Sequence, residues 1–182
     1  MKNKFTNIII GGSGFVGSVL CRELAKKHES VLSIVNSKNP ELKNISQEIC
    51  DVSDTPKLSK LLKGGENVFI LVGQIHPDFL IKNELKMIKN IISSIDASST
   101  KKIFYFSSIR VYGEINQKVQ ENSQCRPLDE YGKFKLESEK LFSKFNIPVI
   151  IVRLTNIYGT PQNKGFIGIV YDKIFSKQEI KI

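Results

Sequence analysis

The sequence has no tryptophan and few of the side chains from which disulfide frameworks and metal centres are built. Its three cysteines, Cys21, Cys50 and Cys125, are an odd number without a Cys-x-x-Cys spacing. This pattern indicates neither a disulfide framework nor a zinc site, and it fits a reducing compartment. Because the two histidines, His28 and His76, also lie far apart in sequence, we predict a cytoplasmic protein that binds no metal.

Long hydrophobic runs are also missing from the chain. Apolar stretches such as residues 68–72 are much shorter than the roughly 20 apolar residues that a membrane-spanning helix needs. The first residues lead directly into Ile8-Ile9-Ile10 and then glycines, without the cleavage site of small residues that is typical of a secretory signal. The sequence therefore predicts no membrane segment and no secretory leader.

The net charge is positive, with 27 lysines and arginines against 18 acids and a formal charge of +9. A basic balance favours anionic partners, nucleic acid among them. The lysines are scattered over the polar faces of predicted helices, however, and the chain has neither an arginine-rich tract nor alternating aromatic and basic residues. This distribution disfavours nucleic acid as a partner and indicates solvated helix faces that also attract anionic metabolites.

Strand-like apolar segments alternate with amphipathic segments along the whole chain, a pattern typical of α/β proteins. We predict one domain over residues 1–182 with a Rossmann-type, doubly wound parallel sheet of strand order 3-2-1-4-5-6 and helices on both faces. The strands are expected at 5–10, 31–35, 45–50, 68–72, 103–106 and 149–152, with residues 179–182 as a candidate seventh. The helices are expected at about 15–28, 55–63, 78–95, 128–145 and 166–176.

A glycine-rich turn follows the first predicted strand and leads into the first predicted helix. The turn reads Gly11-Gly12-Ser13-Gly14-Phe15-Val16-Gly17. In a dinucleotide-binding unit, such glycines allow a tight turn, a close approach of the backbone to a pyrophosphate and close packing of helix on strand. Although glycine turns also serve simple geometry, this position in an alternating α/β pattern favours a dinucleotide site made by Gly11, Gly14, Phe15, Val16 and Gly17.

The end of the second predicted strand is where such folds select between NAD and NADP. An acid there binds the 2′-hydroxyl of the adenosine ribose, and a base accepts a 2′-phosphate. This chain has Asn36-Ser37-Lys38 and no carboxylate. We therefore predict NAD or NADP as the cofactor, with Asn36, Ser37 and Lys38 as contacts and NADP favoured, although a loop lysine is also often just solvated.

Two further motifs occur in order after the glycine turn. Ser107-Ser108-Ile109-Arg110-Val111-Tyr112-Gly113 follows the fifth strand, and Tyr131-Gly132-Lys133-Phe134-Lys135 opens a long helix. With the glycine turn, these motifs resemble the extended short-chain dehydrogenase/reductase family, of the NAD-dependent epimerase/dehydratase type that acts on nucleotide sugars. The resemblance covers essentially the whole chain.

The spacing of Tyr131 and Lys135 places both on one face of a helix. A lysine ammonium and a positively charged nicotinamide both favour a phenolate, so we expect a lowered pKa for Tyr131, which would act as acid and base toward a sugar hydroxyl. The resemblance implies that Lys135 also holds the nicotinamide ribose and that Ser108 hydrogen-bonds the reacting oxygen. The catalytic residues predicted in this way are Ser108, Tyr131 and Lys135.

Other positions match the family pattern more loosely. By resemblance, Asp51 and its neighbour Val52 would contact the adenine, and Val72 and Gly73 would lie along the cofactor. Asn156 would contact the substrate. Each of these residues is also consistent with an ordinary loop or capping role.

The chain departs from the family pattern in two places. Dehydratases of the family carry an Asp-Glu pair where this sequence has Ile109-Arg110, which disfavours a 4,6-dehydratase. Arg110 is instead a candidate contact for a substrate anion, or a solvated arginine. In addition, most of the C-terminal substrate-binding lobe expected from the family is absent from residues 1–182.

We therefore predict an NAD(P)-dependent nucleotide-sugar epimerase or 4-ketosugar reductase. The alternative is a non-catalytic dinucleotide-binding or sensing module, or an inactive fragment of such an enzyme. The family resemblance also implies a homodimer that pairs through the helices at 78–95 and 128–145.

Overall fold

The structure is a computed structural model that describes residues 5–73, 80–159 and 166–176. Its centre is a six-stranded sheet in which every neighbouring pair is parallel, with the order β3-β2-β1-β4-β5-β6. The strands are β1 (Asn7–Ile10), β2 (Val31–Val35), β3 (Ser46–Ile49), β4 (Asn67–Ile70), β5 (Lys102–Ser108) and β6 (Val149–Leu154). The predicted α/β class and the predicted strand order are confirmed.

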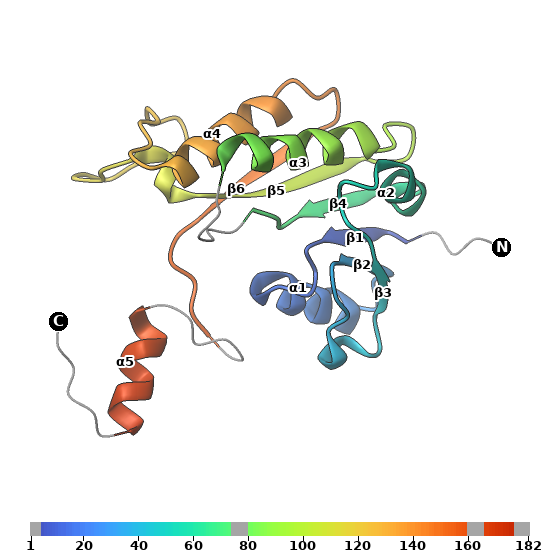
Figure 1. Ribbon diagram of the computed structural model, residues 1–182, viewed down its shortest axis with the longest axis horizontal. Helices are drawn as coiled ribbons and strands as arrows, with labels where there is room; N and C mark the ends of the chain where they lie inside the picture. Colours follow the sequence, from blue (N-terminus) through green and yellow to red (C-terminus); the bar gives the residue numbers. More distant parts are fainter. Residues whose placement is uncertain (1–4, 74–79, 160–165, 177–182) are drawn as a thin grey trace.

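Helices cover both faces of the sheet (Figure 1). The described helices are α1 (Phe15–Lys26), α2 (Thr55–Leu62), α3 (Ile81–Ser94), α4 (Glu130–Phe142) and α5 (Phe166–Phe175), with short 3₁₀ helices η1 (Pro40–Leu42) and η2 (Ile109–Tyr112). Helices α3 and α4 lie side by side on one face, and α1 lies on the other. Each face buries its own apolar cluster, such as Ile88 and Phe134 against one side and Cys21 and Phe69 against the other.

The predicted elements differ from the observed ones mainly at their ends. Strands β5 and β6 run two residues further than expected, because their parallel register continues through Ser107 opposite Arg153 and Ser108 opposite Leu154. Helix α4 begins at Glu130 rather than at residue 128 because the Asp129 side chain accepts a hydrogen bond from Gly132 N and caps the helix. The two 3₁₀ helices were not predicted.

Three predicted features fall on residues outside the described ranges. These are the start of the helix expected from residue 78, the candidate strand at 179–182, and His76. In the described part of the chain, no helix is both long enough and apolar enough to cross a membrane.

Helix α5 differs from the other helices in its surroundings. Figure 1 shows it standing away from the sheet, and none of its side chains from Gly168 onward belongs to the two buried clusters. Its apolar side chains Ile169, Tyr171, Ile174 and Phe175 are more than half exposed. The ordered core that positions the functional residues is therefore formed by β1–β6 and α1–α4.

Candidate functional site

The glycine turn after β1 is shaped by close contacts between backbone segments. Gly11 has a φ of +89°, a left-handed conformation that favours glycine, and a Cβ there would come within 2.8 Å of Leu71 O. A Cβ on Gly17 would overlap Gly11 O and lie 2.8 Å from Gly12 Cα. The turn therefore requires glycine at positions 11 and 17, as the dinucleotide-binding pattern predicts.

The first turn of α1 presents backbone donors rather than side chains. Gly14 is the N-cap residue, no side chain caps the helix, and the first turn contains no acid. The first backbone N–H groups of a helix have no partner within it, and they carry the positive end of the helix dipole. Gly14, Phe15, Val16 and Gly17 line one cavity, so this end of α1 could hold a pyrophosphate through its backbone N–H groups.

The end of β5 carries the serine motif. Ser107 and Ser108 are the last two residues of the strand, and both are buried. The Ser108 side chain caps η2 by accepting a hydrogen bond from Arg110 N at 3.2 Å. This cap turns the chain sharply after the strand and brings Arg110 toward the start of α4.

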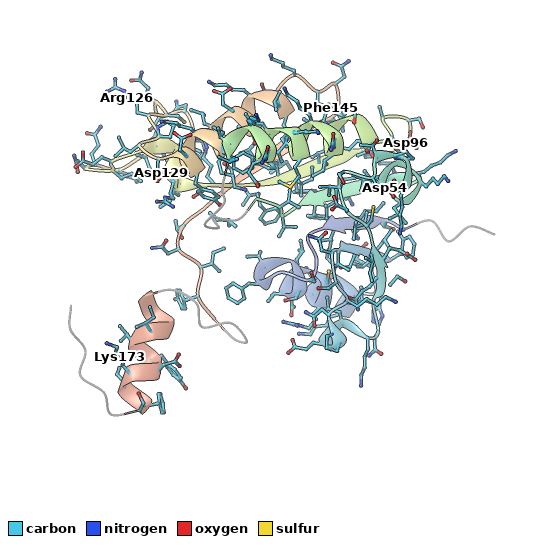
Figure 2. All side chains as sticks on the ribbon, viewed as in Figure 1. Asp54, Asp96, Arg126, Asp129, Phe145 and Lys173 are labelled. Atoms are coloured by element: carbon cyan, nitrogen blue, oxygen red, sulfur yellow. The ribbon has the colours of Figure 1, made fainter. Side chains whose placement is uncertain are left out.

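At the start of α4, Arg110 forms an ion pair with Asp129, with Nη2 and Oδ2 2.7 Å apart. Asp129, labelled in Figure 2, uses its other carboxylate oxygen to cap α4 through Gly132 N at 2.7 Å. The guanidinium carbon of Arg110 lies 5.7 Å from the centroid of the Tyr131 ring. Arg110 therefore links the serine motif to the beginning of the helix that carries Tyr131.

Lys135 lies one turn further along α4 and is almost completely buried. Its Nζ donates hydrogen bonds to Val72 O at 3.0 Å and to Phe106 O at 2.9 Å, so it joins the ends of β4 and β5. Burial lowers the pKa of Lys135 to about 8, although the carboxylates of Glu84 and Glu139 act in the opposite direction. Its Nζ lies 5.6 Å from the Tyr131 ring centroid.

The expected lowering of the Tyr131 pKa is wrong for this structure. Burial raises the pKa of the phenol, and the negative charge of Asp129 raises it further. The nearby cation that lowers the pKa is Arg110, whereas the Lys135 ammonium is directed at two backbone carbonyls. The sequence spacing correctly placed Lys135 and Tyr131 on the same face of the helix. It did not reveal that Arg110 is the cation that lowers the pKa of Tyr131.

One cavity of about 760 Å³ collects most of these residues. It is lined by the glycine turn, Val72 and Gly73, the ends of β5 and β6, and all three predicted catalytic residues, Ser108, Tyr131 and Lys135. Arg110 and Asn156 line it as well. Among the described lining residues, the charged ones are the cations Arg110 and Lys135, so this part of the cavity fits an anionic ligand.

A second cleft of about 350 Å³ shares Gly11, Gly14, Val72 and Gly73 with the first. Of the residues predicted on the adenosine side, Asn36 and Val52 line this cleft. Ser37, Lys38 and Asp51 do not line it, and all three are exposed. The Asp51 carboxylate instead accepts a hydrogen bond from Ser53 N at 2.7 Å, which lowers its pKa. The two cavities are therefore neighbours, and both are lined by the glycine turn.

Sequence reasoning missed several residues of the site. Cys50, Glu84 and Met87 line the second cleft, and they come from β-strand ends and helix faces that carry no motif. Two residues outside both cavities, Glu139 and Arg153, were missed as well; they form a largely buried ion pair next to Ser107, with Nη2 and Oε2 2.7 Å apart. The four-residue spacing from Lys135 to Glu139 was an available signal for the first of this pair.

Comparison with known proteins places this geometry in a larger context. The chain is 30% identical to the uncharacterized UDP-glucose epimerase YtcB of Bacillus subtilis (strain 168), over 85% of this chain and 57% of that protein. It is 29% identical to the dTDP-D-glucose 4,6-dehydratase of Dictyostelium discoideum, over 85% of this chain and 44% of that protein. The chain thus spans about half the length of the curated relatives it matches.

Among solved structures, the chain is similar to the UDP-glucuronic acid 4-epimerase from Bacillus cereus in complex with NAD. The TM-score is 0.81 and the identity 25%, covering 94% of this chain and 63% of that one. A model of the NAD dependent epimerase/dehydratase family matches residues 7–182. A match over nearly the whole chain, in agreement with the observed fold and glycine turn, means that this protein belongs to the NAD-dependent epimerase/dehydratase family.

Proposed function

We propose that this chain forms the dinucleotide-binding part of an NAD-dependent nucleotide-sugar epimerase. The observation that carries the proposal is the single cavity that Ser108, Tyr131 and Lys135 share with the glycine turn. A dinucleotide whose pyrophosphate lies at the first turn of α1 reaches along Val72 and Gly73 toward Tyr131. The names of the relatives indicate nucleotide sugars as the class of substrate.

The side chains of the cavity divide the chemistry among them. Bound nicotinamide supplies a hydride acceptor and donor at the sugar carbon. Tyr131 removes the proton from the hydroxyl on that carbon and returns it later, and Ser108 hydrogen-bonds the same oxygen. Lys135, held by Val72 O and Phe106 O, keeps a positive charge beside the Tyr131 ring and would hold the ribose of a bound nicotinamide dinucleotide.

We propose NAD rather than NADP as the cofactor. The structure offers no support for NADP, since Lys38 is exposed and is not among the residues that line the second cleft. The charged residue that does line that cleft is the acid Glu84, which would repel a further phosphate. The relative of known structure was also solved with NAD.

The reaction we propose is epimerisation rather than dehydration, although one relative is a 4,6-dehydratase. Eliminating water needs an acid and a base in addition to the tyrosine. Among the described residues, none that lines the main cavity carries a carboxylate, and position 110 holds an arginine that is engaged with Asp129. Reduction of a 4-ketosugar uses the same three side chains, and it differs in releasing the oxidised cofactor after each turnover.

The first experiment is a fluorescence titration of the 182-residue chain with NADH and NADPH. The absence of tryptophan keeps the signal of the reduced nicotinamide free of overlapping protein emission. We expect saturable binding of NADH and at least tenfold weaker binding of NADPH. Binding of neither cofactor would overturn the proposed function, and stronger binding of NADPH would overturn the choice of NAD.

A second experiment decides between an enzyme and a non-catalytic binding module. The chain spans only about half of its relatives' length, and this favours the binding module. UDP-glucose is incubated with the protein and NAD, and formation of its 4-epimer is followed by chromatography. Turnover that Tyr131→Phe lowers at least about 100-fold, with unchanged NADH affinity, supports the epimerase. Tyr171→Phe, on the exposed helix α5, is the matched control. NADH binding without turnover would show that residues 1–182 by themselves bind the dinucleotide but do not catalyse epimerisation.

A further inference from the structure

A buried group of polar side chains lies behind the cavity, on the far side of Ser107. Glu139, on α4, accepts hydrogen bonds from Arg153 Nε at 3.0 Å and from Arg153 Nη2 at 2.7 Å. The Ser107 hydroxyl donates to the same carboxylate at 2.5 Å. Glu139 is 5% exposed, so a carboxylate with three donors is fixed in one position inside the protein.

The position of this carboxylate follows from the helix and the sheet together. Glu139 lies four residues after Lys135 and eight after Tyr131, so all three share the face of α4 that packs on the sheet. The register of β5 and β6 places Ser107 directly opposite Arg153. Glu139 therefore connects the helix that carries Lys135 with the strand that ends in Ser108.

Arg153 extends the connection to a more distant segment. Its Nη1 donates to Tyr112 OH at 2.7 Å and to Glu121 O at 3.0 Å. Its guanidinium carbon lies 4.8 Å from the centroid of the Tyr112 ring. The hydroxyl of Tyr112 in turn donates to Gln120 O at 3.0 Å. Arg153 is thus held from several sides, and it holds Glu139 in turn.

The fixed Glu139 carboxylate affects Lys135 because both belong to one group of charged and aromatic side chains. Lys135 is surrounded by Glu84 on α3, by Glu139 and Tyr131 on its own helix, and by Tyr105 on β5, whose ring centroid is 5.1 Å from Nζ. Burial disfavours the ammonium, and both carboxylates favour it. Because Arg153 and Ser107 fix the Glu139 carboxylate, its negative charge cannot turn away from Lys135.

We propose that Glu139 is a positioning residue that acts through Lys135: clamped by Arg153 and Ser107 and four residues further along the same helix face, it holds a fixed negative charge next to the Lys135 ammonium. Glu139 itself is not among the residues that line the cavity. The importance of Lys135 for turnover rests on the proposed function, but its charge state is measurable without cofactor or substrate.

The experiment is an NMR titration of the protein labelled with ¹³C at lysine Cε, in which the Lys135 signal is identified by its absence from Lys135→Arg. In Glu139→Gln, which keeps the size of the side chain and removes its charge, we expect the Lys135 pKa to fall by about one unit. Glu137→Gln is the matched control, because Glu137 lies on the exposed face of the same helix and pairs with Lys140. It should leave the Lys135 pKa unchanged.

A second variant keeps the test decisive if Glu139→Gln does not fold, because a lone Arg153 would then be partly buried without its partner. The double variant Glu139→Leu/Arg153→Met replaces the pair with apolar side chains of similar size, an exchange that buried ion pairs often tolerate. We expect it to fold and to lower the Lys135 pKa by about half a unit, since a nearby cation is lost together with the carboxylate. A Lys135 pKa equal to that of the wild type in the folded variants would overturn the proposal.

The NADH titration of the same variants separates this proposal from the proposed function. If the Lys135 pKa falls as expected but the wild-type protein binds no dinucleotide, the role of Glu139 stands and the proposed function fails. If the wild type binds NADH but the Lys135 pKa does not change in the Glu139 variants, the proposed function stands and the proposed role of Glu139 fails.

Discussion

Two arginine–carboxylate pairs hold α4, one at its start and one near its end, and they differ mainly in their exposure to solvent. Both have a shortest N···O distance of 2.7 Å. The side chains of Arg110 and Asp129 are 47% and 40% exposed, whereas those of Arg153 and Glu139 are 20% and 6% exposed. Water screens the first pair strongly and the second pair weakly.

This difference separates two tasks that an ion pair can perform. An exposed pair adds little to stability, but Arg110 still affects the Tyr131 ring, which it contacts at the mouth of the cavity. A buried pair is costly to break, because the surviving charge remains in the protein interior. We therefore expect the start of α4 to tune the chemistry of Tyr131 and its distal part to hold the architecture around Lys135.

The largest expected effect is on the free energy of unfolding when Arg153 is removed. Arg153→Ala leaves Glu139 buried without its partner and removes the contact with Tyr112, so we expect a loss of about 3–5 kcal/mol. Arg110→Ala breaks the exposed pair and should lower the stability by no more than about 1 kcal/mol. Urea unfolding of the two variants measures both values. Equal losses would contradict the distinction between the two pairs.

The region around the exposed Arg110–Asp129 pair, at the start of α4, was largely predictable from the sequence. The turn from Gly11 to Gly17, the serine motif and the spacing of Tyr131 and Lys135 are local patterns, and the fold places them around one cavity as expected. Arg110 was a candidate on the same grounds. Local spacing is sufficient here because each motif sits at the end of a strand or on one face of a helix, positions that the parallel α/β order brings together.

The region around the buried Arg153–Glu139 pair was not predictable in the same way. The contact between Arg153 and Glu139 requires β6 to continue to Leu154 beside β5, and this register joins residues far apart in the sequence. The error in the pKa of Tyr131 has a similar origin, because burial and the Arg110–Asp129 geometry depend on the whole fold. Lys38 stays a prediction, since its charge suggests a cofactor contact but it is not among the residues that line the second cleft.

An intermediate effect is expected at Asp129, whose two carboxylate oxygens have different partners. Asp129→Ala removes both the helix cap and the ion pair, and we expect a loss of about 1–2 kcal/mol, mostly from the cap. Asp129→Asn keeps a capping oxygen and loses the negative charge, so the loss should stay below about 0.5 kcal/mol. Thermal and urea unfolding distinguish these values. If Asn were as damaging as Ala, the ion pair and not the cap would stabilise the start of α4.

The smallest expected effect is a shift in the pH dependence of turnover, and it tests the chemical role of the exposed pair. The Arg110 cation favours the phenolate form of Tyr131, so Arg110→Gln removes an interaction that lowers the Tyr131 pKa. The pKa then rises, and the limb of the kcat/KM profile that reports deprotonation of Tyr131 moves to higher pH, by about half a unit. Arg110→Lys keeps the charge and should restore most of the shift. Because the Arg110–Asp129 pair is exposed, added salt should reduce the difference in limb position between the wild type and Arg110→Gln. Any difference in limb position that Arg153→Lys causes at the buried pair should persist in salt. A limb that stays in place, or moves to lower pH, would show that Arg110 does not act on Tyr131 and that the exposed pair is purely architectural.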